Sequence, residues 1–506
     1  MKKILFLILS FVMGVHSAFA KPVDQVIDAT LAPVTDVFSK IVFYPVKIFG
    51  SDIPISILWI LIGGIFFSIY YRGIAVWGFK HAISLLFRKT ANKAEDGTGE
   101  VSSLQALATA LSGTIGLGSI AGVAIAISIG GPGAIFWIVV GAILGMPLKF
   151  LEATLAVKYR RFNADGSVSG GPMHYIMHGL TRKGLRWLGQ PLAVIFAFLL
   201  LPGSLGCGNM LQINQATQQV ILITGNEKSI FYDNAWIFGL IVAVIVALIV
   251  IGGIKSIAKV TEKIVPFMCF LYVIIGLIVV FANFTLIPET FLKILKEAFC
   301  PEAVEGGVAA TIIIGLRRSV QSNEAGTGSA PIAYATVKTK EPISQGFVSL
   351  LEPFLTACLC VLSALTIVIT GSYKEYNEGV SGIQLTSSAF ESVISWSPYV
   401  LAIVIILFAL STIISWAYYG QKGWTYLFGE GKKRIIFYQL LFCGVIIAGA
   451  SINLKSIVDF TDAGMLAMSV PNLIALYILM KDVKFDLEVY CKEYNVCPKF
   501  ITRKSR

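Results

Sequence analysis

Residues 111–122 read Leu-Ser-Gly-Thr-Ile-Gly-Leu-Gly-Ser-Ile-Ala-Gly and lie inside an apolar run, 104–130, that is long enough to span a bilayer. Each glycine costs a helix roughly 1 kcal/mol relative to alanine, so the four glycines predict a broken transmembrane helix. Unpaired backbone groups at that depth must be buried in protein or line a wet cavity. The freed carbonyls can bind Na⁺, and the amides that begin the next half-helix can bind a carboxylate.

A second break is predicted at 321–331, which read Gln-Ser-Asn-Glu-Ala-Gly-Thr-Gly-Ser-Ala-Pro within the apolar run 305–337. The carboxylate of Glu324 is costly at that depth and marks a functional position. We interpret Glu324 as a brace of the break, and the alternatives are that it pairs with a basic residue or carries a proton. The two breaks fall in the first and sixth of the ten spans that follow an opening helix. That placement is expected for a five-plus-five inverted repeat with discontinuous helices.

The composition predicts an all-α polytopic membrane protein. Of the 506 residues, 56% are hydrophobic and 14% are charged, against about 25% charged in soluble domains. Apolar runs predict about eleven transmembrane helices. They lie near 53–76, 104–130, 132–157, 190–222, 234–253, 259–283, 305–337, 343–370, 399–420, 435–451 and 457–480.

Basic residues predict the orientation of these spans. The six segments assigned to the cytoplasm contain 27 lysines and arginines, and the five external segments contain 8. This bias predicts an external N-terminus and a cytoplasmic C-terminus in a bacterial-type plasma (inner) membrane. It also accounts for the net charge of +11 without a nucleic-acid partner.

The chain is expected to divide into four parts. Residues 1–20 resemble a cleavable secretory signal peptide, with two lysines, an apolar run and an Ala-Phe-Ala end. Residues 21–52 form an external segment, 53–480 the transmembrane domain and 481–506 a cytoplasmic tail. The amphipathic segment 77–87 is expected on the cytoplasmic surface.

Enzyme motifs are missing from the sequence. It contains no HExxH, GxSxG or P-loop pattern and no clustered His/Asp set, so the chain is not expected to be an enzyme. Gly116-x-Gly118-x-x-Ala121 loosely matches a dinucleotide fingerprint, but it follows no predicted strand. A channel, whose broken helices would line a continuous pore, stays open as an alternative.

Several ordered blocks of sequence resemble the alanine or glycine:cation symporter family. They are GGPGAIFW at 130–137, KFLEATLAVKYR at 149–160, GGPM at 170–173, GNMLQIN at 208–214, SNEAG at 322–326, FALSTI at 408–413, WAYYG at 416–420 and PNLIAL at 471–476. The resemblance implies a LeuT-type fold with one extra N-terminal helix, sodium coupling, and symport of a small neutral amino acid by alternating access. The rival coupling ion is the proton.

Two departures from the family pattern fall beside the breaks. Ser119 stands where the family usually has asparagine, and Gln321 stands where it usually has an aromatic residue. Both departures are expected to make the substrate pocket more polar or roomier. We therefore expect a polar neutral amino acid (serine, threonine, asparagine or glutamine) to be accepted beside alanine and glycine, with an acidic substrate as a minor alternative.

The candidate site combines backbone at the breaks with polar side chains from other helices. The substrate is expected to contact Thr114, Gly116, Gly118, Ser119, Gly122, Gln212, Gln321, Asn323 and Trp416. Na⁺ is expected to bind at Gly113, Gly116, Ser411 and Thr412, because oxygen ligands suit a hard cation. Gln212 and Asn214 cannot share a helix face, and we favour Gln212.

The charged residues within the spans allow more than one interpretation. Lys149 and Glu152 lie three positions apart, which predicts an ion pair within one helix, with a gating role as the alternative. Arg317 and Arg318 could snorkel to the outer interface, form a gate ion pair, or attract an anionic substrate.

Overall fold

The computed structural model describes residues 39–48, 51–87, 98–163, 166–300, 307–375, 382–452, 454–496 and 498. The predicted signal peptide, 1–20, lies outside the described residues. Two short antiparallel ribbons accompany the helices: β1 (Pro45–Ile48) pairs with β2 (Ser51–Pro54), and β3 (Arg161–Phe162) pairs with β4 (Val168–Ser169).

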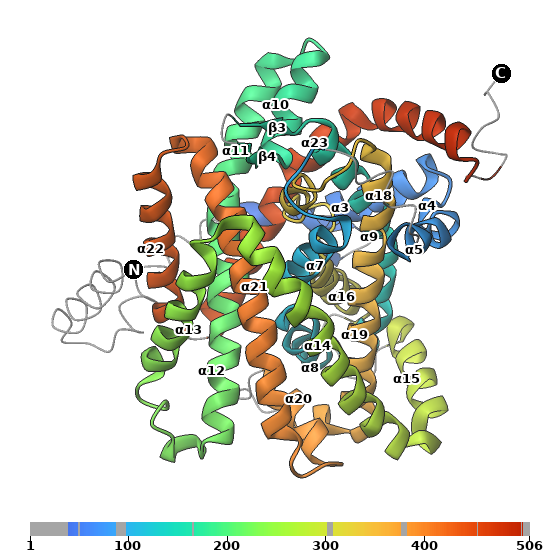
Figure 1. Cartoon of the computed structure of the whole chain (residues 1–506). Coiled ribbons are helices and arrows are strands. Elements are labelled where there is room, and N and C mark those ends of the chain that lie inside the picture. Colours follow the sequence, from blue (N-terminus) through green and yellow to red (C-terminus); the bar gives the residue numbers. More distant parts are fainter. Residues whose placement is uncertain are drawn as a thin grey trace.

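Helices form nearly all of the described structure (Figure 1). In chain order they are α3 (Ile55–Tyr70), α4 (Ile74–Trp77), α5 (Phe79–Phe87), α7 (Ser103–Thr114), α8 (Ala121–Gly130), α9 (Ala134–Lys158), α10 (Pro172–Arg182), α11 (Arg186–Leu205), α12 (Leu211–Ile223), α13 (Ala235–Val250), α14 (Gly253–Ala282), α15 (Ile287–Phe299), α16 (Gly307–Asn323), α17 (Pro331–Tyr334), α18 (Pro342–Ser349), α19 (Leu351–Thr370), α20 (Gly382–Glu391), α21 (Ser397–Phe428), α22 (Lys432–Gly449) and α23 (Leu454–Tyr494). The short turns are η1 (Leu117–Ser119), η2 (Gly206–Met210, π-helical), η3 (Asn226–Lys228), η4 (Phe284–Leu286) and η5 (Ser372–Glu375).

Six described helical segments are long and apolar enough to cross a membrane, and two bent helix pairs raise the number to eight. The bent pairs are α3 with the α4–α5 segment, at 68°, and α7 with the η1–α8 segment, at 59°. All eleven predicted spans lie on helices. However, α13 is only 16 residues long, and α16 carries two arginines. The multi-pass helical architecture is confirmed, whereas the number eleven and the inverted repeat remain predictions.

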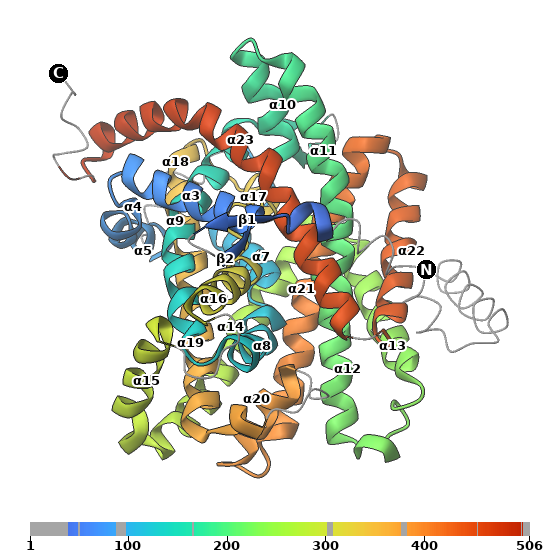
Figure 2. The ribbon, with the colours of Figure 1, turned by 180° about the vertical axis from the view of Figure 1, so that it is seen from behind.

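The connections between helices gather at two opposite ends of the molecule. α10, the β3–β4 ribbon and the C-terminal part of α23 lie at one end, and α15 and α20 lie at the other (Figures 1 and 2). Arg160 links three of the connections at the first end. It follows α9, and its guanidinium donates to the carbonyl of Thr98, before α7, and to that of Thr339, between α17 and α18, both at 2.7 Å. Burial lowers the pKa of Arg160 to about 10, so it stays charged at neutral pH.

The C-terminal helix continues beyond the predicted end of the last span. α23 runs to Tyr494, past residue 480. Its polar part is held by two ion pairs, Lys158–Asp486 at 2.5 Å and Lys183–Asp482 at 2.6 Å. The first part of the predicted tail is therefore a helix docked on the α9–α10 end of the molecule.

Candidate functional site

The first break frees two carbonyls at the end of α7. In an uninterrupted helix, the amides of Gly116 and Leu117 would donate to the carbonyls of Ser112 and Gly113. Here the Gly116 amide donates to Thr114 O at 2.9 Å, and the Leu117 amide donates to Gln212 Oε1 at 3.0 Å. The predicted break is confirmed, and the carbonyls of Ser112 and Gly113 are left for other partners.

Two side chains of α21, one helical turn apart, donate hydrogen bonds to these carbonyls. Thr412 Oγ1 donates to Ser112 O at 2.8 Å, and Trp416 Nε1 lies 3.3 Å from Gly113 O. Ser411 is oriented differently: its hydroxyl donates to Phe408 O at 2.9 Å and lies 3.5 Å from the Met268 sulfur. Of the two hydroxyls predicted to bind Na⁺, the structure brings Thr412 to the break and turns Ser411 toward α14.

Gln212, at the start of α12, reaches the break directly after the π-helical turn η2, which the sequence analysis missed. Its Nε2 donates to Cys207 O at 3.0 Å, within η2, while its Oε1 accepts from Leu117. A side chain at Gly208 would overlap Trp416, so glycine is required where η2 crosses α21. The glycines of this turn were the available signal. Asn214 points elsewhere, to Ile452 O at 2.7 Å, which agrees with the preference for Gln212.

Gln321 lies against the start of α8. A Cβ placed on Gly118 would be 3.3 Å from the Gln321 carbonyl oxygen, and one on Gly122 would be 3.5 Å from Gln321 Oε1. Gln321 is 5% exposed, and its Nε2 has no hydrogen-bond partner among the described residues. A buried amide donor therefore lies beside the unpaired amides and the positive dipole end of α8.

Arg318 fixes the orientation of this amide. Its guanidinium donates to Gln321 Oε1 and also pairs with Asp462 of α23. Arg317 contacts the same carboxylate at 2.5 Å and Asp459 at 3.6 Å. The snorkelling alternative is therefore wrong for Arg318, which is only 5% exposed. A carboxylate 144 residues away, invisible to local pattern analysis, holds it inside.

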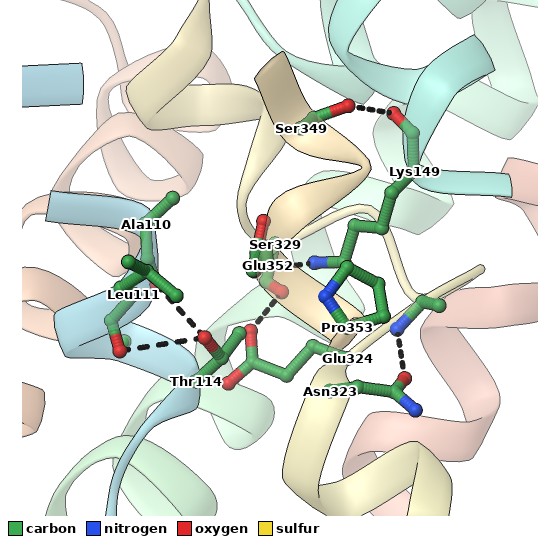
Figure 3. A network of polar contacts seen from close by, with 12 residues as sticks. Ala110, Leu111, Thr114, Lys149, Asn323, Glu324, Ser329, Ser349, Glu352 and Pro353 are labelled. Carbon is green, nitrogen blue, oxygen red and sulfur yellow. Dashed lines mark hydrogen bonds and ion pairs between the residues drawn. The ribbon is translucent and has the colours of Figure 1, made fainter. Parts of the chain in front are cut away.

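The helix is interrupted at the second break, as predicted, and a loop joins α16 to the four-residue α17. α16 ends at Asn323, and three residues then adopt left-handed backbone conformations: Glu324 (φ 53°), Gly326 (φ 83°) and Gly328 (φ 86°). Glu324 is buried and accepts from Ser329 Oγ (Figure 3). It also accepts from Trp416 Nε1 at 3.2 Å. The carboxylate braces the loop and links it to the first break through Trp416.

The side chains of two other predicted substrate contacts, Thr114 and Asn323, are engaged elsewhere in this conformation. Thr114 Oγ1 donates to its own helix, to Ala110 O at 3.2 Å (Figure 3). Asn323 Oδ1 accepts from the Ala325 amide at 2.8 Å, and its Nδ2 donates to Ser319. Ser119 is buried in η1, where its carbonyl accepts from Ser363 Oγ, while its own hydroxyl has no hydrogen-bond partner among the described residues.

The predicted ion pair within α9 is wrong. Lys149 instead pairs with Glu352 of α19, with 2.9 Å between Nζ and Oε1 (Figure 3). Glu152 accepts a hydrogen bond from Asn472 of α23 at 2.6 Å. Sequence spacing shows only neighbours on the same helix, whereas the partner of Lys149 lies 203 residues away.

Oxygen atoms thus converge on the first break. A Cβ placed on Gly116 would lie 2.7 Å from Thr412 Oγ1 and 2.9 Å from Gln212 Oε1, so only glycine fits there. Carbonyl and hydroxyl oxygens suit a hard monovalent cation. No group of three His, Cys, Asp or Glu side chains within the described ranges is placed to hold a metal ion.

The chain is similar to known proteins over most of its length. The family model described as "Sodium:alanine symporter family" matches residues 36–499. The sodium/alanine symporter AgcS of Methanococcus maripaludis is 38% identical over 430 residues, covering 84% of this chain and 92% of that protein. The probable sodium/glutamine symporter GlnT of Bacillus subtilis is 33% identical over 438 residues, covering 85% and 86%.

Solved structures show the same fold at low sequence identity. The crystal structure of MhsT in complex with L-phenylalanine is 15% identical and gives a TM-score of 0.55, covering 75% of this chain and 89% of that chain. A substrate-bound, outward-open Na⁺-coupled sialic acid symporter is 12% identical and gives a TM-score of 0.50, covering 87% and 92%. These LeuT-fold transporters confirm the LeuT-type fold. The family match over residues 36–499 and the 38% identity to AgcS show that this chain belongs to the sodium:alanine symporter family.

Proposed function

We propose that this protein is a Na⁺-coupled symporter of small neutral amino acids that works by alternating access. The carrying observation is the convergence of the Ser112 and Gly113 carbonyls, Thr412 Oγ1 and Gln212 Oε1 on the first break. Thr412 supplies the hydroxyl ligand, and the carbonyls of 112–116 supply the backbone ligands. The site lies between two discontinuous helices, where half-helix ends can hold both the ion and the substrate.

The substrate is held beside this ion. Its carboxylate meets the amides at the start of α8, where helix dipoles favour negative charge. Its side chain meets Gln321 and Trp416. Because Arg318 occupies Gln321 Oε1, the free Nε2 presents donors, which suits a side-chain carbonyl or hydroxyl. We therefore propose polar neutral amino acids, including glutamine and serine, beside alanine and glycine.

Uptake into proteoliposomes tests the function. Purified protein is supplied with labelled serine, glutamine, alanine, glycine, glutamate and leucine, with an inward Na⁺ gradient or with choline at constant pH. Saturable uptake that needs the Na⁺ gradient is expected. Uptake driven by a pH gradient in choline would instead establish proton coupling, and uptake that never saturates would establish a channel.

Two variants test the role of Gln321. Gln321→Phe restores the aromatic residue of the family pattern, and Gln321→Met keeps the side-chain length while removing the amide. Losing one buried hydrogen bond should lower the ratio of glutamine to alanine uptake about tenfold in both variants, corresponding to about 1.4 kcal/mol. If both variants stay active with the parental ratio, Gln321 does not contact the substrate.

A further inference from the structure

A second cluster of buried charges lies on the α9 side of the second break. We define the Lys149 cluster as Lys149, Glu152, Glu324 and Glu352, each at most 1% exposed. Lys149 contacts Glu352 at 2.9 Å and is also a charged neighbour of Glu152 and Glu324. If all four groups were ionised, three carboxylates would share one ammonium group. Buried charges without a partner cost several kcal/mol each, so this state is unfavourable.

Glu152 is the least satisfied carboxyl of the Lys149 cluster. Its Oε1 accepts from Asn472 at 2.6 Å, while Oε2 has no hydrogen-bond partner, although the Gly326 backbone lies close to the carboxyl. The charged groups near it are Lys149 and Glu352. The phenols of Tyr175 and Tyr334 donate to its neighbours Asn472 and Glu352 respectively.

A proton relieves this imbalance better than a metal ion does. The described residues contain no group of three His, Cys, Asp or Glu side chains that could hold a metal ion, and this includes the carboxylates of the Lys149 cluster. A neutral carboxyl group needs no cation. An unpaired buried hydroxyl group costs free energy, but less than a buried charge without a partner does. The Lys149–Glu352 pair seen here is therefore the arrangement expected when Glu152 carries a proton.

Ionisation of Glu152 would create a competitor for Lys149. The two residues lie three positions apart on α9, close enough to interact on one helix face. A rotation of the lysine side chain alone would then exchange Glu352 for Glu152. We propose that Glu152 is a proton-binding site and that its protonation decides whether Lys149 pairs with Glu352 or with Glu152.

The exchange of partners by Lys149 affects the second break, because two hydrogen bonds connect the Lys149 cluster to that loop. Asn472, the partner of Glu152, also donates to Gly326 O at 2.9 Å. Glu352, the partner of Lys149, accepts from Tyr334 in α17 at 2.8 Å. Deprotonation therefore alters the support on both sides of the loop. The inference rests on the proposed function, in which this loop moves during transport.

The test compares uptake at a series of equal internal and external pH values under a constant Na⁺ gradient. Wild-type uptake should fall on the alkaline side, about tenfold per pH unit once Glu152 titrates, because the protonated fraction falls by that factor. Glu152→Gln keeps the neutral arrangement, because its amide oxygen can still accept from Asn472, and should remove this fall. Glu341→Gln, outside the Lys149 cluster, should keep the wild-type profile.

Two results would overturn the proposal while leaving the symporter function intact. One is a wild-type profile without an alkaline fall, and the other is an unchanged fall in Glu152→Gln. Absence of saturable Na⁺-dependent uptake at every pH would instead refute the proposed function. Infrared spectroscopy of the wild-type protein covers the case in which the variant does not fold: a protonated-carboxyl stretch should be present at neutral pH and disappear on alkalinisation, and its absence at neutral pH would also overturn the proposal.

Discussion

Thr412 contacts the first break through its side-chain hydroxyl group. Its Oγ1 bonds Ser112 O and lies closer to the Cβ position of Gly116 than any other atom does. Thr412→Ala removes this oxygen and leaves the backbone intact. We expect the Na⁺ concentration for half-maximal uptake to rise about tenfold, as for the loss of about 1.4 kcal/mol, with the ranking of amino acids unchanged. Uptake measured against Na⁺ concentration checks this.

Ser411→Ala is the matched control for this prediction. Ser411 also loses one hydroxyl, but that hydroxyl contacts Phe408 and Met268 rather than the break. Its Na⁺ dependence should therefore change less than that of Thr412→Ala. A larger effect from Ser411→Ala would place the ion on the α14 side of α21 and contradict the proposed ligand set.

Residue types, spacing and the family resemblance together predicted the side chains that gather at the first break, including Gln212, Gln321 and Thr412. They could not predict the partners of Lys149 and Arg318. A helical pattern gives the face on which a side chain lies, but not which distant helix packs against that face. Both partners are carboxylates more than 140 residues further along the chain.

The loop between α16 and α17 depends on glycine at Gly328. Its φ is 86°, and a Cβ there would lie 2.7 Å from Pro172 and 2.9 Å from Phe196. Gly328→Ala should cost about 1–2 kcal/mol for the left-handed backbone and about 1–3 kcal/mol more for overpacking. A lower unfolding temperature of the purified protein, together with weaker uptake, is the expected result.

Gly184→Ala separates the two contributions. Gly184 has a similar φ of 77°, but nothing lies within 4 Å of its Cβ position. This variant should show only the backbone cost and keep normal uptake. Equal destabilisation of the two variants would mean that packing around the loop contributes nothing.

Broken helices were predictable because glycine, proline and a carboxylate interrupt otherwise apolar runs. The π-helical turn at η2 was missed, although Gly206 and Gly208 lie within it. Those glycines serve close packing against other helices, Phe460 and Trp416 respectively, rather than a turn in the chain direction. Only the tertiary structure distinguishes these two uses of glycine.

The arrangement of the whole molecule agrees with the charge asymmetry of the sequence. The ion pairs of α23 place the C-terminal helix at the same end as the α9–α10 connection, and both segments are rich in lysine and arginine. α15 and α20, which belong to segments poor in these residues, lie at the other end (Figure 2). The number of spans stays a prediction. α13 and α16 lie on predicted apolar runs, but α13 is only 16 residues long and α16 carries two arginines.

We predict that the α10 end of the molecule faces the cytoplasm, since positive residues accumulate on that side. A fluorescent reporter that folds only in the cytoplasm should be active at the C-terminus, and alkaline phosphatase should be inactive there. The same reporters inserted at Gly184 should agree with the C-terminus, because the adjacent Lys183 is paired with Asp482 of α23. Reporters inserted in η3, at the opposite end, should give the reverse pattern. Phosphatase activity at the C-terminus would invert the proposed orientation, and agreement between η3 and the C-terminus would contradict the arrangement of spans.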